Sequence, residues 1–312
     1  MIQPSYLQKG DKIALVAPAK RILDGELEEA IQLIQDWGFQ PVLGNNIYKQ
    51  YDLGYVFAGT DEQRAEDFQW ALDNPEIKAI WCARGGYGSV KIIDRLDFEY
   101  FKTNPKWIIG YSDITVLHNH INSLGYQTIH GVTAKKLVDV EYHSDSYPSL
   151  FRALTGENIN YTISNTNQYN KCGEIEGELV GGNLSIVYSL LGSQSALQPK
   201  NKILFLEDWF ENWYAVDRML MNLKRNGIFD QISGLILGSF THMDTEDENE
   251  ENYNHPYDPK TYEVIREIVK DYQIPIAFGF PAGHTGHNLA LKMGEKVHLK
   301  VDTNSVNLQF NY

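Results

Sequence analysis

The sequence predicts an α/β protein with two domains. Its 312 residues exceed what one typical hydrophobic core accommodates and suit two medium cores. In the first half, short apolar segments alternate with amphipathic helical segments, which is typical of a mostly parallel sheet covered by helices. The pattern changes at about Phe151, where a polar stretch precedes a β-rich unit. We therefore expect an α/β domain at residues 1–150, a linker at 151–172 and a smaller β-rich domain at 173–312.

The first half contains the clearest strand and helix patterns. Lys12–Pro18 has the apolar character of a buried strand. Asp24–Trp37 carries apolar residues at helical spacing, and Gly38 follows where a helix C-cap is expected. The other elements expected here are a helix at Asp61–Leu72 and buried strands at Ile77–Cys82, Trp107–Gly110 and Gln127–His130.

The second half has fewer regular patterns. Asn158–Gly173 is polar and shows no helical period, as a linker would. Asp244–Asn254 is a dense acidic run without ordered ligand spacing, so we interpret it as a solvated loop and not as a metal site. The expected elements are helices at Gly182–Leu191 and Asn212–Asn226 and strands at Ile203–Leu206 and Leu235–Leu237.

Composition excludes several classes of function. A net charge of −14 argues against nucleic-acid binding, because phosphate contacts require a surplus of Lys and Arg. It also means that an anionic ligand would need local positive groups. No apolar run approaches the roughly 20 residues of a membrane helix, and we see no secretory signal at Met1–Gly10. Cys82 and Cys172 form no disulfide framework, so we expect a cytoplasmic protein.

Ser112 is a candidate nucleophile. It lies in Trp107–Thr115, which runs from a predicted strand through Gly110 into a helical stretch. A serine at such a turn projects its hydroxyl at the carboxyl end of a sheet, beside the N–H groups of the helix start. The segment differs from a G-x-S-x-G elbow because Ile114 replaces the second glycine. The segment alone leaves open that Ser112 or Asp113 only caps the helix.

A glycine-rich loop, Ala83–Ser89, follows another predicted strand. Adjacent glycines at 85 and 86 allow close approach of backbone to a ligand, which suits a phosphate cradle or half of an oxyanion hole. The loop lacks both the G-x-G-x-x-G spacing and a following Gly-Lys-Ser/Thr, so a nucleotide site has no further support. A plain tight turn remains the alternative.

Glu207 and His284 are candidates for the remaining catalytic groups. Glu207 ends an apolar strand beside Asp208, where it could orient an imidazole or pair with a basic residue. His284 and His287 lie among glycines in Pro281–Asn288, which denies them the helix of a zinc-binding pair but leaves a general base possible.

Seven sequence blocks, in the same order, make the chain resemble the LD-carboxypeptidase family, which includes the microcin C self-immunity peptidases. The blocks are Leu7–Pro18, Phe57–Asp61 with Arg64, Arg84–Gly88, Gly110–Asp113, Gly181–Ser185, Leu206–Asp208 and Gly283–Thr285. Val132 departs from the pattern, since many members have a proline there. The resemblance implies a flavodoxin-like N-terminal domain and a smaller β-rich C-terminal domain.

The resemblance also implies a mechanism and a partner. It assigns a catalytic triad to Ser112, Glu207 and His284 and an oxyanion hole to the backbone N–H groups of Gly86 and Asp113. The implied activity is serine-type hydrolysis of the L,D amide bond of cytoplasmic murein tetrapeptides, releasing D-alanine in cell-wall recycling. This activity requires no cofactor and no metal. The resemblance also implies a homodimer.

Two alternatives and three structural predictions remain. The alternatives are an immunity-type peptidase acting on a peptidyl-adenylate antibiotic and a non-catalytic two-lobed binding module. We predict that the triad converges from both domains, with Ser112 on the first, and that Ser112 has a strained backbone. We also predict that Arg84 and Asn183 bind the substrate carboxylate, although an ion pair for Arg84 and a helix cap for Asn183 are possible.

Overall fold

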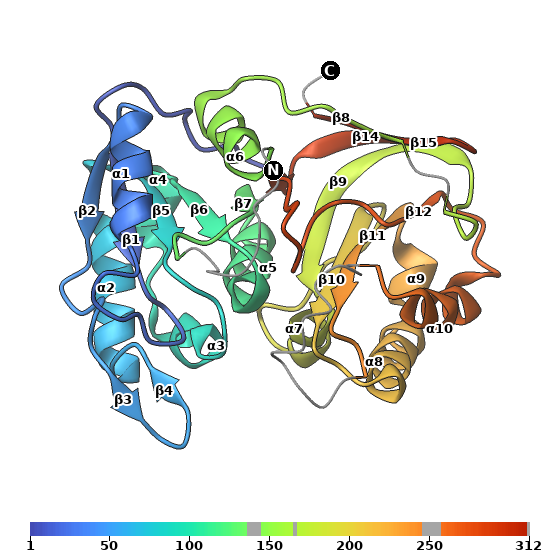
Figure 1. Ribbon diagram of the computed structural model, residues 1–312, viewed down its shortest axis with the longest axis horizontal. Coiled ribbons are helices and arrows are strands. Elements are labelled where there is room, and N and C mark those ends of the chain that lie inside the picture. Colours follow the sequence, from blue (N-terminus) through green and yellow to red (C-terminus); the bar gives the residue numbers. More distant parts are fainter. Residues whose placement is uncertain (136–144, 165–166, 245–256, 311–312) are drawn as a thin grey trace.

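The computed structural model describes residues 1–135, 145–164, 167–244 and 257–310. Two sheets, one from each half of the chain, lie side by side with helices packed on them (Figure 1). Most of the acidic run at Asp244–Asn254 lies outside the described residues. Within the described part, no helix combines the length and apolar character needed to cross a bilayer.

The first sheet confirms the flavodoxin-like prediction. Its five parallel strands follow the order β2-β1-β5-β6-β7, which is the 2-1-3-4-5 order of flavodoxin-like folds. Ligands of such sheets bind at the carboxyl ends of the strands. The five strands are β1 (Lys12–Val16), β2 (Gln40–Leu43), β5 (Ile77–Cys82), β6 (Trp107–Gly110) and β7 (Thr128–His130).

Of the two helices predicted with bounds in the first half, α2 begins at its predicted residue and ends one residue later, whereas α1 begins four residues later than predicted, at Glu28. Thr60 caps α2 in a reciprocal arrangement with Gln63. Gly38 follows α1 with φ +83°, as expected for a residue just past a helix end. The elements are α1 (Glu28–Asp36), α2 (Asp61–Asp73), α3 (Ser89–Ile92), α4 (Glu99–Thr103) and α5 (Thr115–Ser123), with a hairpin of β3 (Tyr51–Asp52) and β4 (Val56–Phe57).

The second sheet has seven strands in the order β12-β11-β10-β9-β14-β15-β8. Strands β12 to β9 are parallel, and the other three pair antiparallel. The strands are β8 (Tyr161–Ser164), β9 (Gly173–Asn183), β10 (Ile203–Trp209), β11 (Gly234–Thr241), β12 (Ile276–Phe278), β14 (Lys296–Val301) and β15 (Ser305–Phe310). The helices are α7 (Leu184–Ser189), α8 (Trp213–Arg225), α9 (Ile228–Gln231) and α10 (Pro259–Val269).

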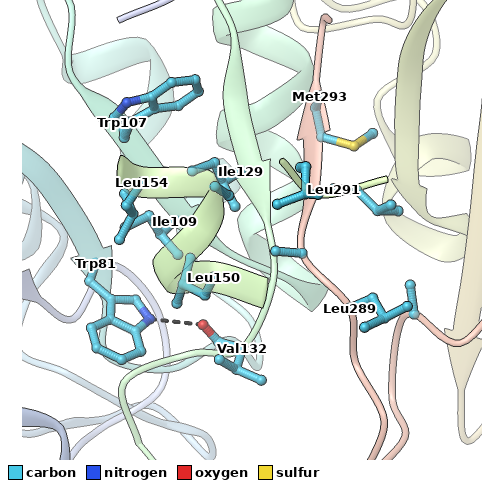
Figure 2. Packing of buried hydrophobic residues seen from close by; sticks show 14 of the residues in the cluster. Trp81, Trp107, Ile109, Ile129, Val132, Leu150, Leu154, Leu289, Leu291 and Met293 are labelled. Carbon is cyan, nitrogen blue, oxygen red and sulfur yellow. Dashed lines mark hydrogen bonds between the residues drawn. The ribbon is translucent and has the colours of Figure 1, made fainter. Parts of the chain in front are cut away.

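The segment predicted as a linker contains regular structure. Helix α6 spans Ser146–Thr155, and β8 joins the edge of the second sheet. Leu150 and Leu154 of α6 belong to the same buried cluster as Trp81 and Ile109 of the first sheet (Figure 2). The polar residues around β8 concealed this strand, because an edge strand buries only one of its faces.

The two sheets share a core. Strand β13 (Leu291–Met293) comes from the second half of the chain but pairs antiparallel with β7 at the edge of the first sheet. Its Leu291 and Met293 pack in the cluster that contains Trp81, whose indole N–H donates to the Val132 carbonyl at 2.8 Å (Figure 2). We therefore describe the two halves as one packed body.

The helix expected from Gly182 begins two residues later, at Leu184. Gly181 and Gly182 have φ of +119° and +132° and belong to β9. A Cβ at Gly181 would lie 2.1 Å from the Phe205 carbonyl oxygen, and one at Gly182 would lie 2.5 Å from Thr115 Oγ1. The glycines thus allow β9 to approach both β10 and α5, which brings the second sheet against the helix that follows Ser112.

Candidate active site

Ser112 lies at the carboxyl end of β6, in the first turn toward α5. Its φ is +64°, a left-handed conformation that is uncommon for residues other than glycine. The prediction of a strained backbone is therefore confirmed. Gly110 permits the turn, because a Cβ there would lie 2.8 Å from Ile114 Cγ1. Such strain is typical of a nucleophile held in place by its surroundings.

His118, on α5, forms a hydrogen bond with the backbone of this turn. Its Nε2 donates to the Gly110 carbonyl at 2.8 Å, and its Nδ1 lies 2.9 Å from Thr128 Oγ1. The ring is fully buried, and burial lowers the pKa of His118 to about 4. A neutral ring with its proton on Nε2 can donate to the carbonyl and accept from the threonine.

The glycine loop lies against Ser112. A Cβ at Gly85 would be 2.9 Å from Ser112 Cβ and 3.2 Å from its Oγ, so only glycine allows this approach. The Asp113 carboxylate accepts from the Ser89 N–H at 2.8 Å, which joins the two turns. Within the described part of the chain, the Gly86 N–H has no hydrogen-bond acceptor. The loop is therefore placed to present a free donor beside the serine.

The Glu207 side chain points toward the site because side chains alternate between the two faces of strand β10. Successive side chains of β10 point to opposite faces, so Phe205 and Glu207 share the face that packs toward the first sheet. Leu204 and Leu206 belong to the core on the other face. A register irregularity against β11 lies between Leu206 and Asp208. Glu207 is fully buried.

His284 meets Glu207 from the loop between β12 and β13. Glu207 Oε2 accepts from His284 Nδ1 at 2.7 Å and from the His284 backbone N–H at 3.1 Å. A Cβ at Gly283, where φ is +112°, would lie 2.6 Å from the same oxygen. With Nδ1 as donor, the neutral ring has its unprotonated Nε2 pointing away from Glu207.

Two aromatic rings hold the His284 imidazole. Trp209 stacks on it with ring centres 5.8 Å apart, and Tyr111 contacts it at 4.8 Å. Tyr111 immediately precedes Ser112, so this contact brings the serine turn beside the histidine loop. In the described residues, Ser112 Oγ forms no hydrogen bond with the imidazole. Catalytic hydrogen bonds of this kind often tighten only when substrate binds.

The electrostatic surroundings of His284 suit a general base. Burial by itself would lower the pKa of His284, but the charge and hydrogen bond of Glu207, aided by Asp208, raise it above the usual value. The raised pKa helps the imidazole to hold the proton that it accepts from the nucleophile, and the protonated ring can later donate it.

Asn183 has a structural role. Its side chain accepts from the Ile186 N–H at 3.2 Å as the N-cap of α7, and its Nδ2 donates to Asp208 at 2.8 Å. Asp208 also accepts from the Ser185 N–H, and burial beside Glu207 raises its pKa to about 7. Because the Asn183 amide is committed to α7 and Asp208, we do not assign it to the substrate carboxylate.

In the described part of the chain, Arg84, unlike Asn183, has no partner that commits its side chain to a structural role. Among the described residues it forms no ion pair, and it lies close enough to Glu26 to lower the pKa of that carboxyl group, together with Lys135. Lys135 pairs with Glu26 at 2.6 Å, and its backbone N–H bonds to Ala83. The Lys20 backbone N–H bonds to the Gly85 carbonyl. Three cationic residues thus lie on neighbouring segments in a chain of net charge −14.

The sequence pattern did not predict the contacts of Tyr111, Trp209 and His118. Tyr111 and Trp209 lie one and two residues from predicted catalytic positions, but their contact with His284 depends on how the two sheets pack. No group of three or more His, Cys, Asp or Glu residues in the described ranges is arranged to hold a metal ion.

Comparison with known proteins agrees with this architecture. Residues 13–131 match the LD-carboxypeptidase N-terminal domain, and residues 176–299 match the LD-carboxypeptidase C-terminal domain. A Bacillus subtilis protein named a probable murein peptide carboxypeptidase is 33% identical over 305 residues, covering 94% of this chain and 90% of that protein. The microcin C7 self-immunity protein of Escherichia coli is 28% identical, and the match covers 98% of this chain and 95% of that protein.

Solved structures show the same relationship. The muramoyltetrapeptide carboxypeptidase of Oxalobacter formigenes superposes with a TM-score of 0.83 at 26% identity, covering 96% of this chain and 99% of that one. The fold and the family matches make this chain an α/β peptidase. It belongs to the LD-carboxypeptidase family.

Proposed function

We propose that the protein is a serine-type LD-carboxypeptidase that removes the terminal D-alanine of murein tetrapeptides. The observation that carries the proposal is the buried Glu207–His284 hydrogen bond beside the strained Ser112 turn. The names of the relatives support the substrate class. A cytoplasmic location and a homodimer remain predictions from the family resemblance.

The proposed reaction begins with a proton transfer. His284 Nε2 accepts the Ser112 hydroxyl proton as Oγ attacks the carbonyl carbon of the L,D amide bond. Glu207 keeps the imidazole in the required tautomer and stabilises its positive charge. The carbonyl oxygen becomes an oxyanion, which the N–H groups of Gly86 and Asp113 are proposed to stabilise. In other enzymes, loss of one such donor raises the barrier by about 3–4 kcal/mol.

The second half of the reaction restores the enzyme. The C–N bond breaks, His284 donates its proton to the leaving amine, and D-alanine departs with its carboxylate unchanged. A water molecule then attacks the seryl ester, giving its proton to His284. Ser112 recovers its hydroxyl proton when the ester bond breaks, and the shortened peptide leaves as a carboxylic acid.

Mass spectrometry of a murein tetrapeptide incubated with the purified protein tests this proposal. The expected products are a tripeptide and free D-alanine. The same peptide ending in L-alanine is the matched control and should remain uncleaved. An intact tetrapeptide after prolonged incubation at neutral pH would refute the proposed function.

Arg84 is proposed to bind the terminal carboxylate of the substrate. The Arg84→Ala variant should lose most of the preference of the wild type for the free acid over the C-terminal amide. A carboxylate left without its charged partner loses about 1.5–3 kcal/mol of interaction, so we expect about a 10- to 100-fold fall in kcat/KM for the acid alone. Arg95, an exposed arginine of the first half, provides a control through Arg95→Ala. An unchanged preference would place carboxylate recognition elsewhere.

An exposed aromatic ring near the site supports a second candidate function. Phe210 is 37% exposed and contacts Trp209, which stacks on His284. An exposed ring could stack on a nucleobase, as an immunity-type peptidase for peptidyl-adenylates would require. A non-hydrolysable aminoacyl sulfamoyl adenosine should then inhibit the wild type but not Phe210→Ala. Absence of inhibition would leave the murein peptide as the substrate.

A further inference from the structure

Tyr55 lies at the edge of the site without a role in the mechanism above. It occupies the turn of the β3–β4 hairpin. Its Oη accepts from the Tyr87 N–H at 2.9 Å. A Cβ at Gly86 would lie only 2.3 Å from the same oxygen, so the hydroxyl contacts the Cα of the proposed oxyanion donor. The preceding residue, Gly85, makes an equivalent close approach to Ser112.

The Tyr55 ring is fixed by its neighbours. Phe57 contacts it edge-on at 5.0 Å and Tyr87 at 6.1 Å, while Lys20 Nζ lies 5.5 Å from the ring centre. A ring held on several sides gives its hydroxyl one position, so a hydrogen bond to it costs little side-chain entropy.

The hydroxyl keeps a free proton. Burial, together with nearby Asp113, raises the pKa of Tyr55 above its usual value, although the Tyr87 N–H and Arg84 act in the opposite direction. The group is therefore protonated at neutral pH. A phenol can donate one hydrogen bond while accepting another, and in the described part of the chain the Tyr55 O–H has no acceptor.

In the proposed mechanism, the leaving D-alanine carries a carboxylate close to the oxyanion loop. Only the amide nitrogen and one Cα separate that carboxylate from the carbonyl that Ser112 attacks. The Tyr55 hydroxyl, which contacts Gly86 of the oxyanion loop, is therefore at a suitable range from that carboxylate. Arg84 lies on the same loop, and a carboxylate can accept about four hydrogen bonds from several donors at once.

We propose that the Tyr55 hydroxyl donates a hydrogen bond to the terminal carboxylate of the substrate and, with Arg84, selects peptides with a free C-terminus. This inference rests on the proposed carboxypeptidase function. It makes Tyr55 a specificity-determining residue of the β3–β4 hairpin.

The test compares the Tyr55→Phe variant with the wild type on a tetrapeptide and on its C-terminal amide. Phenylalanine preserves the ring contacts and removes only the hydroxyl. We expect kcat/KM for the acid to fall about 10- to 100-fold, mainly through KM, because a hydrogen bond to a charged group is lost. The value for the amide should change less than about twofold.

Tyr87→Phe is the matched control, because it removes a neighbouring hydroxyl from a ring that is 47% exposed. It should leave both substrates unaffected. An equal loss for acid and amide in Tyr55→Phe would overturn the proposal, since it would show that Tyr55 only holds the loop or contacts the oxyanion. Failure of the wild type to cleave either peptide would instead refute the carboxypeptidase function, and the Tyr55 proposal with it.

Discussion

Replacing Ser112 by alanine should lower kcat for tetrapeptide cleavage by about four to six orders of magnitude, because the nucleophile of the proposed mechanism is lost. Peptide binding should change little, since the hydroxyl contributes to bond formation and not to recognition. Single-turnover kinetics measure the first effect, and calorimetric titration with the tetrapeptide measures the second.

The control for Ser112→Ala addresses backbone strain. Ser112 has φ +64°, a strained conformation for alanine as for serine, so loss of the hydroxyl contacts that hold the turn would also lower activity if the turn moved. Asn201 has φ +59° and is exposed, so Asn201→Ala introduces comparable strain far from the chemistry. It should keep full activity. More than a tenth of wild-type activity in Ser112→Ala would exclude the serine as nucleophile, whereas binding without any wild-type product would favour the non-catalytic module.

Replacing Glu207 by glutamine should lower kcat by about three to four orders of magnitude, as loss of the orienting carboxylate does in serine proteases. It should also move the acid limb of the pH profile. Activity requires neutral His284, so kcat/KM rises as pH increases through the pKa of that residue. Glu207 raises this pKa, and without its charge the effect of burial dominates. The acid limb should therefore move to lower pH.

The control for Glu207→Gln is Asp208→Asn. Asp208 is the next residue of β10, but it points to the opposite face and binds α7. Because it contributes less to the pKa of His284 than Glu207 does, its replacement should shift the acid limb less and lower kcat much less. An acid limb that stays in place or moves to higher pH in Glu207→Gln would contradict the proposed role of Glu207.

Local patterns in the sequence determined much of the framework. The apolar periods of β5, β6 and α2 predicted these elements within one residue, since each forms from contacts along a short segment. The passage from strand through Gly110 to helix predicted the strained Ser112 for the same reason. Seven ordered blocks indicated the family, which the comparisons show.

Only the tertiary structure decided how these parts meet. The side of β10 that faces the first sheet depends on packing between distant strands, and this packing places Glu207 at His284 and Asp208 at Asn183. The same packing encloses His284 between Tyr111 and Trp209. Strand β13 crosses to the first sheet because its apolar side chains complete a core formed by both halves. Such contacts join residues far apart in the chain, and a period of 2 or 3.6 residues carries no information about them.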